Sequence, residues 1–129
     1  MMDITISQVT FREITPIIPY IKQAKMKIGY TENTSWIAAK NGDELVGVVG
    51  YTVYPEVILY RTDFVKRNYR GRGIYKLLFA ERDRLVSKLG SKTVIAYCTK
   101  YSLGYYLNNG FKEIRKLKKV TYVERVKPI

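Results

Sequence analysis

The sequence predicts an α/β (α+β) fold with one mixed, mostly antiparallel sheet of about six to seven strands, flanked by about three helices. Short β-rich segments recur along the chain and are separated by turn residues. One longer segment, starting at Ile74, carries apolar residues at helical spacing. The chain has 129 residues, of which 47% are hydrophobic, enough for one sizeable core. We therefore expect a single domain over residues 1–129.

The N-terminal third is predicted to hold one strand and one helix. Asp3 to Phe11 alternates apolar and polar residues, as a half-buried strand does. Glu13 to Lys27 is predicted to be a helix, with Thr15 as its cap and Pro16 in a permitted first-turn position. Gly29 to Ser35 is expected to be the loop that follows.

The middle of the chain contains the clearest hairpin pattern. Trp36 to Lys40 and Glu44 to Tyr54 are strand-like and flank the turn Asn41-Gly42-Asp43, in which Asn-Gly favours positive φ angles. Pro55 ends the second strand, and Val57 to Val65 is predicted to return antiparallel to it.

The second half is predicted to alternate helices and strands. After the helix that carries Ile74, Leu77, Leu78, Leu85 and Leu89, we expect a strand at Thr93–Cys98, a short helix at Tyr101–Asn109, and strands at Phe111–Arg115 and Lys119–Val126.

The composition limits the chemistry. The chain has no histidine and one cysteine, Cys98, so neither a thiolate zinc site nor an internal disulfide is expected. For the same reason we expect no metal cofactor. We also expect a cytoplasmic protein, since no long apolar run or signal-peptide pattern is present. Carboxylates, tyrosines, backbone amides and water remain to carry any reaction.

Positive charge is concentrated in the second half. Residues 1–64 contain six Lys or Arg and seven Asp or Glu, whereas residues 65–129 contain seventeen and four. This imbalance indicates an anionic ligand or a polyanionic partner. For the charges outside the turn that contains Gly71 and Gly73, lysines that only maintain solubility are the alternative explanation.

The segment from Tyr60 to Leu89 has the pattern of an anion site. A strand leads into a turn that contains Gly71 and Gly73, and the turn opens a helix. Free amides at a helix start and the helix dipole both favour a bound anion, and glycine lets a phosphate approach those amides.

Two motifs in this order resemble the GNAT superfamily of acyl-CoA-dependent N-acetyltransferases. Arg70-Gly71-Arg72-Gly73-Ile74-Tyr75 is similar to the family signature Arg/Gln-x-x-Gly-x-Gly/Ala, with Val65 five residues earlier. Tyr106-Leu107-Asn108-Asn109-Gly110-Phe111 is similar to the family's Tyr-x-x-x-Gly-Phe landmark. Two positions depart from the family pattern: residue 75 is usually small and is Tyr here, and Thr99 stands where many members have Asn.

The resemblance implies acetyl-CoA as co-substrate and an amine as acceptor. The pyrophosphate would lie on the amides of residues 70–75, and the pantetheine would pair with a strand that splays from its neighbour. The implied cofactor-binding residues are Phe64, Val65, Arg70, Gly71, Arg72, Gly73, Ile74, Tyr75 and Thr99. The amide of Val65 is also the candidate oxyanion donor.

Tyr106 and Asp63 are the candidate catalytic residues. Tyr106 matches the family tyrosine that donates a proton to the leaving thiolate, and packing at a helix end is its alternative role. Strand alternation places Arg61, Asp63 and Val65 on one face, which makes Asp63 the candidate base. Asp63 has an alternative structural role, an ion pair with Arg61 or with a neighbouring strand. In that case water is the candidate base.

Two further possibilities concern partners. The basic residues Lys112, Arg115, Lys116, Lys118, Lys119, Arg125 and Lys127 are interleaved with aromatics, so the protein could act on nucleic acid, or bind it or an associated partner without catalysis. The short segment between Phe11 and Trp36 predicts an open acceptor cleft, or one that a second subunit of a homodimer completes.

Overall fold

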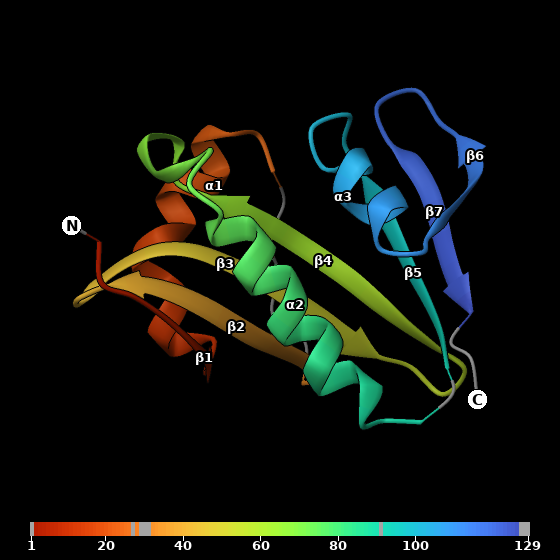
Figure 1. Ribbon diagram of the computed structural model, residues 1–129, viewed down its shortest axis with the longest axis horizontal. Helices are drawn as coiled ribbons and strands as arrows, with labels where there is room; N and C mark the ends of the chain where they lie inside the picture. Colours follow the sequence, from red (N-terminus) through yellow and green to blue (C-terminus); the bar gives the residue numbers. More distant parts are fainter. Residues whose placement is uncertain (1, 27, 29–31, 91, 127–129) are drawn as a thin grey trace.

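A computed structural model describes residues 2–26, 28, 32–90 and 92–126, and it contains one seven-stranded sheet with the strand order β1-β2-β3-β4-β5-β7-β6 (Figure 1). The strands are β1 Ile4–Val9, β2 Thr34–Asn41, β3 Glu44–Val53, β4 Val57–Val65, β5 Thr93–Cys98, β6 Lys112–Lys116 and β7 Thr121–Val126. The helices are η1 Arg12–Ile17, α1 Ile18–Gln23, η2 Arg67–Tyr69, α2 Ile74–Ser87 and α3 Leu103–Asn108. Among the described strands only β4 and β5 are parallel, so the predicted fold class and element order are confirmed.

The predicted hairpin is confirmed. Asn41 pairs with Glu44 across a two-residue turn in which Gly42 has a φ of +60°. Strand β4 runs antiparallel to β3, as the short connection through Pro55 predicts.

The single helix predicted for Glu13 to Lys27 is wrong, because the segment splits into a 3-10 helix, η1, and a short α-helix, α1. Pro16 lies inside η1, and Pro19 lies in the first turn of α1, where a missing N–H is tolerated. The predicted cap Thr15 instead donates to a carbonyl of the preceding turn. Thr10 and Glu13 exchange the reciprocal bonds of a capping box. Residues 27 and 29–31 of the predicted helix and loop lie outside the described residues.

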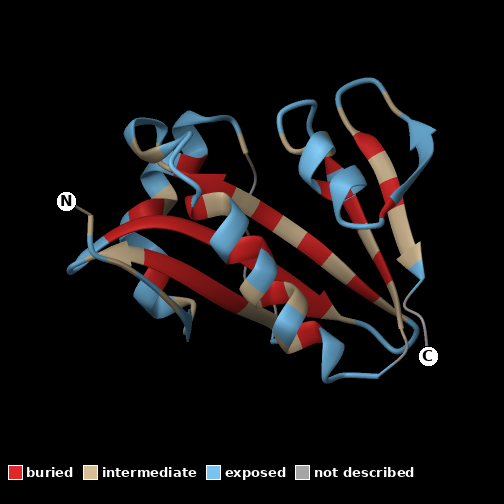
Figure 2. Ribbon diagram, viewed as in Figure 1, coloured by how far each residue is buried: buried red, intermediate tan, exposed pale blue. Residues whose placement is uncertain are grey.

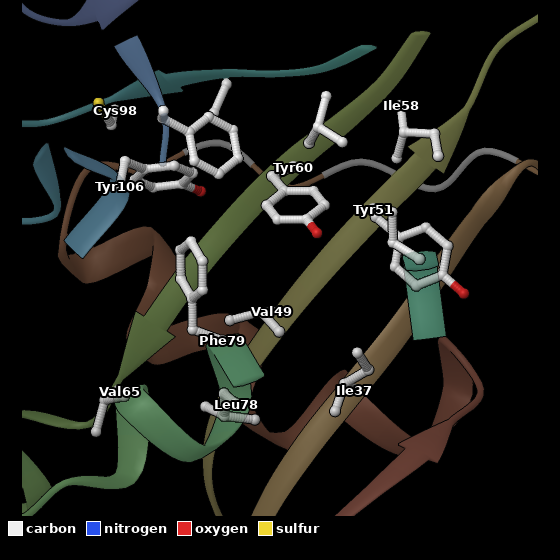
Figure 3. Close-up of a cluster of buried hydrophobic side chains, with 14 of the residues drawn as sticks. Ile37, Val49, Tyr51, Ile58, Tyr60, Val65, Leu78, Phe79, Cys98 and Tyr106 are labelled. Carbon is white, nitrogen blue, oxygen red and sulfur yellow. The ribbon is translucent and has the colours of Figure 1, made fainter. Parts of the chain in front are cut away.

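The sheet is covered on both faces around its centre, and each cover has its own buried cluster (Figure 2). Helix α2 packs on one face, where Leu78 and Phe79 belong to a buried cluster that also contains Tyr60 and Tyr106 (Figure 3). Helices η1 and α1 pack on the other face and bring their isoleucines against Trp36 and Phe64.

The buried face of α2 differs from the one that its leucines predict. Leu77 is 49% exposed and Leu89 is 42% exposed. The buried residues of this helix are Ile74, Leu78, Phe79, Arg82 and Val86. A charged residue therefore occupies a core position in the middle of α2.

A bulge in β4 changes which side chains share a face. The β3–β4 register shifts between Val48 and Gly50, and Thr62 adopts a left-handed φ of +57°. The bulge breaks the strict alternation predicted for this strand. Asp63 consequently faces α2 together with Tyr60, whereas Arg61 hydrogen-bonds to Thr52.

The bulge also marks the point where β4 leaves its parallel neighbour. Pairing between β4 and β5 runs from Val57 to Tyr60, with Tyr60 opposite Ala96. The last residues of β4 therefore have no β5 partner in the described register. This is the splayed arrangement that the resemblance to the GNAT superfamily implies.

Candidate functional site

A groove of about 620 Å³ opens between the end of β4, the turn before α2 and the start of α3. It is lined by Ala24, Met26, Asp63, Phe64, Val65, Arg67, Tyr69, Arg70, Gly71, Gly73, Ile74, Tyr75, Thr99, Tyr101, Ser102 and Tyr105. All the predicted cofactor-binding residues except Arg72 are among them.

The turn at the mouth of the groove has the predicted glycine geometry. Gly71 and Gly73 have φ angles of +75° and +83°, which L-residues adopt only with strain, and Gly73 is the N-cap of α2. A Cβ atom at either glycine would meet no described atom within 4 Å. The positive φ explains the choice of glycine, and the open space leaves the amides at the start of α2 accessible to an anion.

The three arginines of this turn take different positions. Arg70 folds back, and its Nε donates to the Val65 carbonyl oxygen at 2.8 Å, which joins the end of β4 to the turn. Arg72 lies with its guanidinium 5.7 Å from the Tyr69 ring centroid and outside the groove lining. Arg67 lines the groove and is exposed, so it is available to a bound anion.

Tyr75 points from the first turn of α2 toward β4. Its ring lies edge-to-face with Tyr105 at a centroid distance of 4.5 Å, and its hydroxyl donates to Asp63 Oδ2. Burial first, and then the charge of Asp63, raises the pKa of Tyr75 well above its ordinary value, so the phenol keeps its proton.

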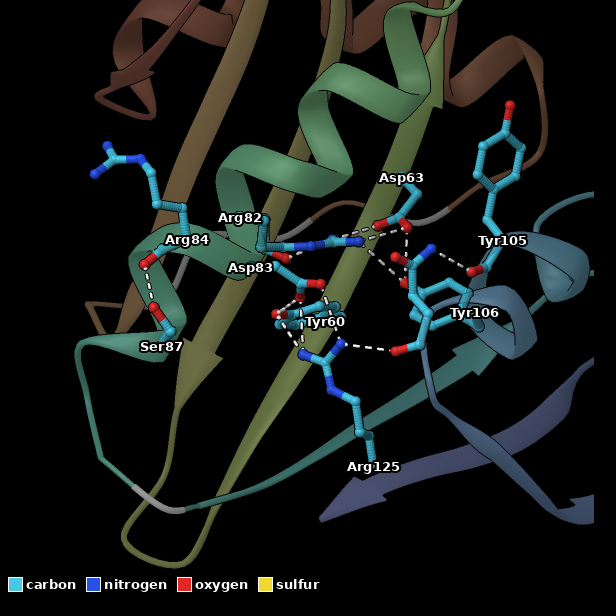
Figure 4. Close-up of polar contacts among 11 residues, drawn as sticks. Tyr60, Asp63, Arg82, Asp83, Arg84, Ser87, Tyr105, Tyr106 and Arg125 are labelled. Carbon is cyan, nitrogen blue, oxygen red and sulfur yellow. Dashed lines mark hydrogen bonds and ion pairs between the residues drawn. The ribbon is translucent and has the colours of Figure 1, made fainter. Parts of the chain in front are cut away.

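Asp63 forms a bidentate ion pair with Arg82 (Figure 4). Arg82 Nη1 is 2.7 Å from Oδ1 and Nη2 is 2.9 Å from Oδ2. The Asp63 side chain is 10% exposed and the Arg82 side chain is fully buried. Burial alone would lower the pKa of Arg82, but the adjacent Asp63 carboxylate raises it well above the ordinary value. The expected alternative pairing of Asp63 with Arg61 is wrong, because the bulge separates those side chains.

Tyr106 belongs to the same network but is not part of the groove lining. Its hydroxyl donates to Asp63 Oδ2 at 2.7 Å and accepts from Arg82 Nη2 at 3.3 Å. The residue is 2% exposed and packs against Phe79 and Phe111, each at a ring-centroid distance of 5.0 Å. Burial, followed by the charge of Asp63, raises the pKa of Tyr106 well above its ordinary value. Both predicted catalytic side chains thus meet, with Tyr106 behind Asp63.

A second ion pair supports this network from the side of β7. Arg125 contacts both oxygens of Asp83, at 3.0 Å and 2.8 Å, and Tyr60 donates to Asp83 at 2.5 Å (Figure 4). The Arg82 guanidinium lies 3.9 Å from the Tyr60 ring centroid, so Tyr60 separates the two pairs. Neither Asp83 nor Arg125 is among the described groove-lining residues.

Sequence reasoning missed Arg82, the buried partner of Asp63. The signal was present, because Arg82 follows Leu78 by four residues and so occupies the apolar stripe of the helix. A charged residue in such a stripe requires a buried partner, and Asp63 is the carboxylate that the bulge brings to it.

Three further observations bear on the chemistry. Cys98 is buried, its Sγ donates to the Thr121 carbonyl oxygen, and burial raises the pKa of the thiol, which disfavours the reactive thiolate. The described residues contain no group of three or more acidic, cysteine or histidine side chains placed to hold a metal ion. None of the described helices has both the length and the apolar character needed to span a bilayer.

Comparison with known proteins agrees with this geometry. Residues 3–127 match the model of the acetyltransferase (GNAT) domain. The fold is similar to an aminoglycoside 6'-N-acetyltransferase complexed with coenzyme A, with a TM-score of 0.79, 13% identity and coverage of 97% of this chain and 99% of that one. It is also similar to PaiA N-acetyltransferase from Thermoplasma acidophilum in complex with coenzyme A, with a TM-score of 0.77, 14% identity and coverage of 98% and 100%.

A third similar structure is the ribosomal-protein-S18-alanine N-acetyltransferase from Escherichia coli, with a TM-score of 0.77, 13% identity and coverage of 95% and 90%. No curated protein sequence matches the chain. At these identities the structural neighbours establish the fold, while the domain match extends over nearly the whole sequence. The chain therefore belongs to the GNAT superfamily and is a compact acyltransferase of that family.

Proposed function

We propose that the protein transfers an acetyl group from acetyl-CoA to an amine by direct attack in a ternary complex. The observation that carries this proposal is the groove, in which an open glycine turn, the splayed end of β4 and a buried carboxylate follow one another. Two of the structurally similar enzymes were solved with coenzyme A, which supports the choice of donor.

In this proposal the pyrophosphate lies on the amides of residues 70–75, with Arg67 beside it. The pantetheine follows Phe64 and Val65, in a groove that Thr99 and Ser102 also line. The thioester carbonyl accepts a hydrogen bond from the Val65 amide, the candidate oxyanion donor. Arg72 contributes charge near the turn rather than a contact in the groove.

The reaction requires three proton transfers, one from the amine, one to the thiolate and one that restores the acid. Asp63 takes a proton from the acceptor amine, the amine nitrogen forms a bond to the acetyl carbon, and the C–S bond breaks. Neutralising Asp63 frees the phenols that donate to it. Tyr106 is the proposed acid for the leaving thiolate; because it lies behind Asp63, it must first release its hydrogen bond to that carboxyl, and the proton on Asp63 then restores the phenol. Tyr75 donates to the same oxygen and lines the groove, so it is the second candidate for the acid.

The site residues favour direct attack over an acyl-enzyme. Cys98 is buried on the β5 side and is not among the described groove-lining residues. An amine that enters from the side of Ala24 and Met26 reaches the same groove, because both residues line it.

A cytoplasmic location fits the use of acetyl-CoA and remains part of the proposal.

The donor site can be tested by replacing Gly73 with alanine. The Cβ would project into the space where the pyrophosphate is proposed to lie. Loss of one or two charge-assisted hydrogen bonds, worth about 1.5–3 kcal/mol, should weaken coenzyme A binding roughly ten- to hundredfold. Isothermal titration with coenzyme A and thermal unfolding with acetyl-CoA measure this effect.

Gly90 provides the matched control. It has a φ of +91°, and a Cβ there also meets no described atom within 4 Å. Gly90→Ala should therefore cause similar backbone strain without changing coenzyme A binding. If wild-type protein binds neither coenzyme A nor acetyl-CoA, the proposed donor is wrong.

The open face of β5, β7 and β6 supports a second candidate function, the binding of nucleic acid with or without catalysis. Cross-strand pairing places Tyr97, Tyr122 and Arg115 in one row, and the Tyr97 and Tyr122 rings lie 5.0 Å apart. Tyr97 is 55% exposed, and every residue of β6 is exposed. Burial and a hydrogen bond to Glu124 raise the pKa of Tyr122 to about 12, so this phenol adds no negative charge at neutral pH.

The salt dependence of binding tests this surface. We expect a labelled single-stranded DNA or RNA oligonucleotide to bind, with an association constant that falls as salt is added. The slope of its logarithm against the logarithm of the salt concentration should decrease in magnitude by about 2 when Lys112 and Arg115 are both changed to Glu. Fluorescence anisotropy measures the slope. The variant Lys22→Glu/Lys88→Glu carries the same charge change on exposed positions elsewhere. Equal slopes for the two variants contradict a nucleic-acid site on this face. Lys127 lies outside the described residues.

A further inference from the structure

We propose that Tyr75 forms the inner end of the donor groove and limits the acyl group to a short chain such as acetyl. The inference rests on the proposed function, because it assumes that an acyl-CoA occupies this groove. It concerns which acyl donors the enzyme accepts. That is a separate question from whether coenzyme A binds.

The direction of the groove places the acyl group near Tyr75. Phosphates on the turn before α2 lie beside Val65, and a donor that follows β4 away from the turn passes Phe64 before it reaches Asp63. The Tyr75 hydroxyl ends at Asp63. The acyl end of the donor, which lies farthest from the phosphates, therefore meets the ring of Tyr75 and the carboxylate of Asp63.

The ring of Tyr75 is held in place from several directions. It packs edge-to-face against the rings of Tyr105 and Phe79, at ring-centroid distances of 4.5 Å and 5.9 Å. Its hydroxyl donates to Asp63, which Arg82 fixes through two further hydrogen bonds. A longer acyl chain would have to break these contacts, so Tyr75 acts as a rigid wall.

The residues behind Tyr75 are aromatic and buried. Phe79 and Tyr106 are each 2% exposed, their ring centroids lie 5.0 Å apart, and neither is among the described groove-lining residues. Phe79 touches Tyr75 directly. Replacing the Tyr75 ring with a small side chain would extend the groove toward Phe79 and add apolar space for several methylene groups.

The position of Tyr75 also accounts for its departure from the usual small residue. A large side chain that pointed into the mouth of the groove would increase the distance between helix α2 and the phosphates. Tyr75 instead turns away from the mouth of the groove, toward Asp63. Its size therefore acts on the acyl end of the donor.

Binding of acetyl-CoA and hexanoyl-CoA to the wild type, Tyr75→Phe and Tyr75→Ala tests the proposal, with coenzyme A as the reference ligand. Isothermal titration should show that wild type prefers acetyl-CoA by about tenfold or more, the scale of steric discrimination in an apolar pocket. Tyr75→Phe keeps the ring and should keep this preference. Tyr75→Ala should lose it, with hexanoyl-CoA binding about tenfold or more tightly than to wild type.

The controls separate this inference from the donor proposal. Tyr75→Leu is the substitute if the alanine variant does not fold, and it should show the same loss of preference to a smaller degree. Equal binding of both acyl-CoAs by wild type, or an unchanged preference in the alanine and leucine variants, overturns the role of Tyr75 while coenzyme A binding persists. If neither coenzyme A nor an acyl-CoA binds, the donor site itself is wrong.

Discussion

Replacing Arg82 with methionine is expected to lower the free energy of unfolding by about 3–5 kcal/mol, the usual effect of removing one partner of a buried ion pair. The Arg82 side chain is fully buried, and its guanidinium supplies two hydrogen bonds to Asp63 and one to the Gly50 carbonyl oxygen. Without it, Asp63 keeps a largely buried negative charge with only tyrosine hydroxyls as partners. Urea unfolding followed by circular dichroism measures the loss.

Arg84 on the same helix is the matched control. It also forms a bidentate pair, with Glu81, but its side chain is 55% exposed. Arg84→Met should therefore change stability little, since an exposed pair gains little over solvated charges. In the double variant Asp63→Asn/Arg82→Met, part of the loss should be recovered, with a coupling of about 0.5–3 kcal/mol. Equal effects of Arg82→Met and Arg84→Met would contradict the buried pair.

Replacing Asp63 with asparagine is expected to lower the rate of acetyl transfer by about 10²–10⁴-fold, the usual contribution of a general base. Asparagine keeps the size of the side chain but cannot take the proton of the amine. Titration should show that acetyl-CoA still binds, because the glycine turn is intact. The release of free thiol from acetyl-CoA provides the rates. The acceptor amines to be tried are a peptide whose N-terminal residue is alanine, an aminoglycoside and a simple diamine.

Asp83→Asn controls for the loss of an ion pair. Asp83 pairs with Arg125 and accepts from Tyr60, but it lies outside the groove lining, so this variant should keep most of its activity. Tyr106→Phe and Tyr75→Phe are tested in the same assay. The variant with the larger loss of rate identifies the phenol that protonates the thiolate. If Asp63→Asn and Asp83→Asn have equal rates, Asp63 is not the base and water takes that role.

The β4 strand shows where sequence reasoning succeeds and where it fails. Its residues predict a strand that leads into an anion-binding turn, and both features are present. The alternation rule fails at Thr62, because a bulge with a positive φ inserts one extra residue opposite β3. No local pattern marks Thr62, and the contacts that Asp63 makes next to the bulge join it to Arg82 and Tyr106, far along the chain.

The N-terminal segment gives a similar lesson. Thr15 and Pro16 suggest a helix start, but the capping box forms earlier, at Thr10 and Glu13. Two candidate caps, Thr10 and Thr15, lie within a few residues of each other, and in the observed structure Ile14 and Ile17 are buried against the sheet. Local signals therefore predict that a helix exists more reliably than where it begins.

The sequence by itself determined the order of the elements, the β2–β3 hairpin, the glycine turn and the concentration of positive charge, because each depends on neighbouring residues or on composition. The tertiary structure decided that Asp63 pairs with Arg82, that Tyr106 lies behind Asp63, and that Tyr75 closes the groove. These contacts join residues 12 to 43 positions apart in the chain. Their partners follow from the bulge in β4 and from the face that α2 buries, and neither is determined by local sequence.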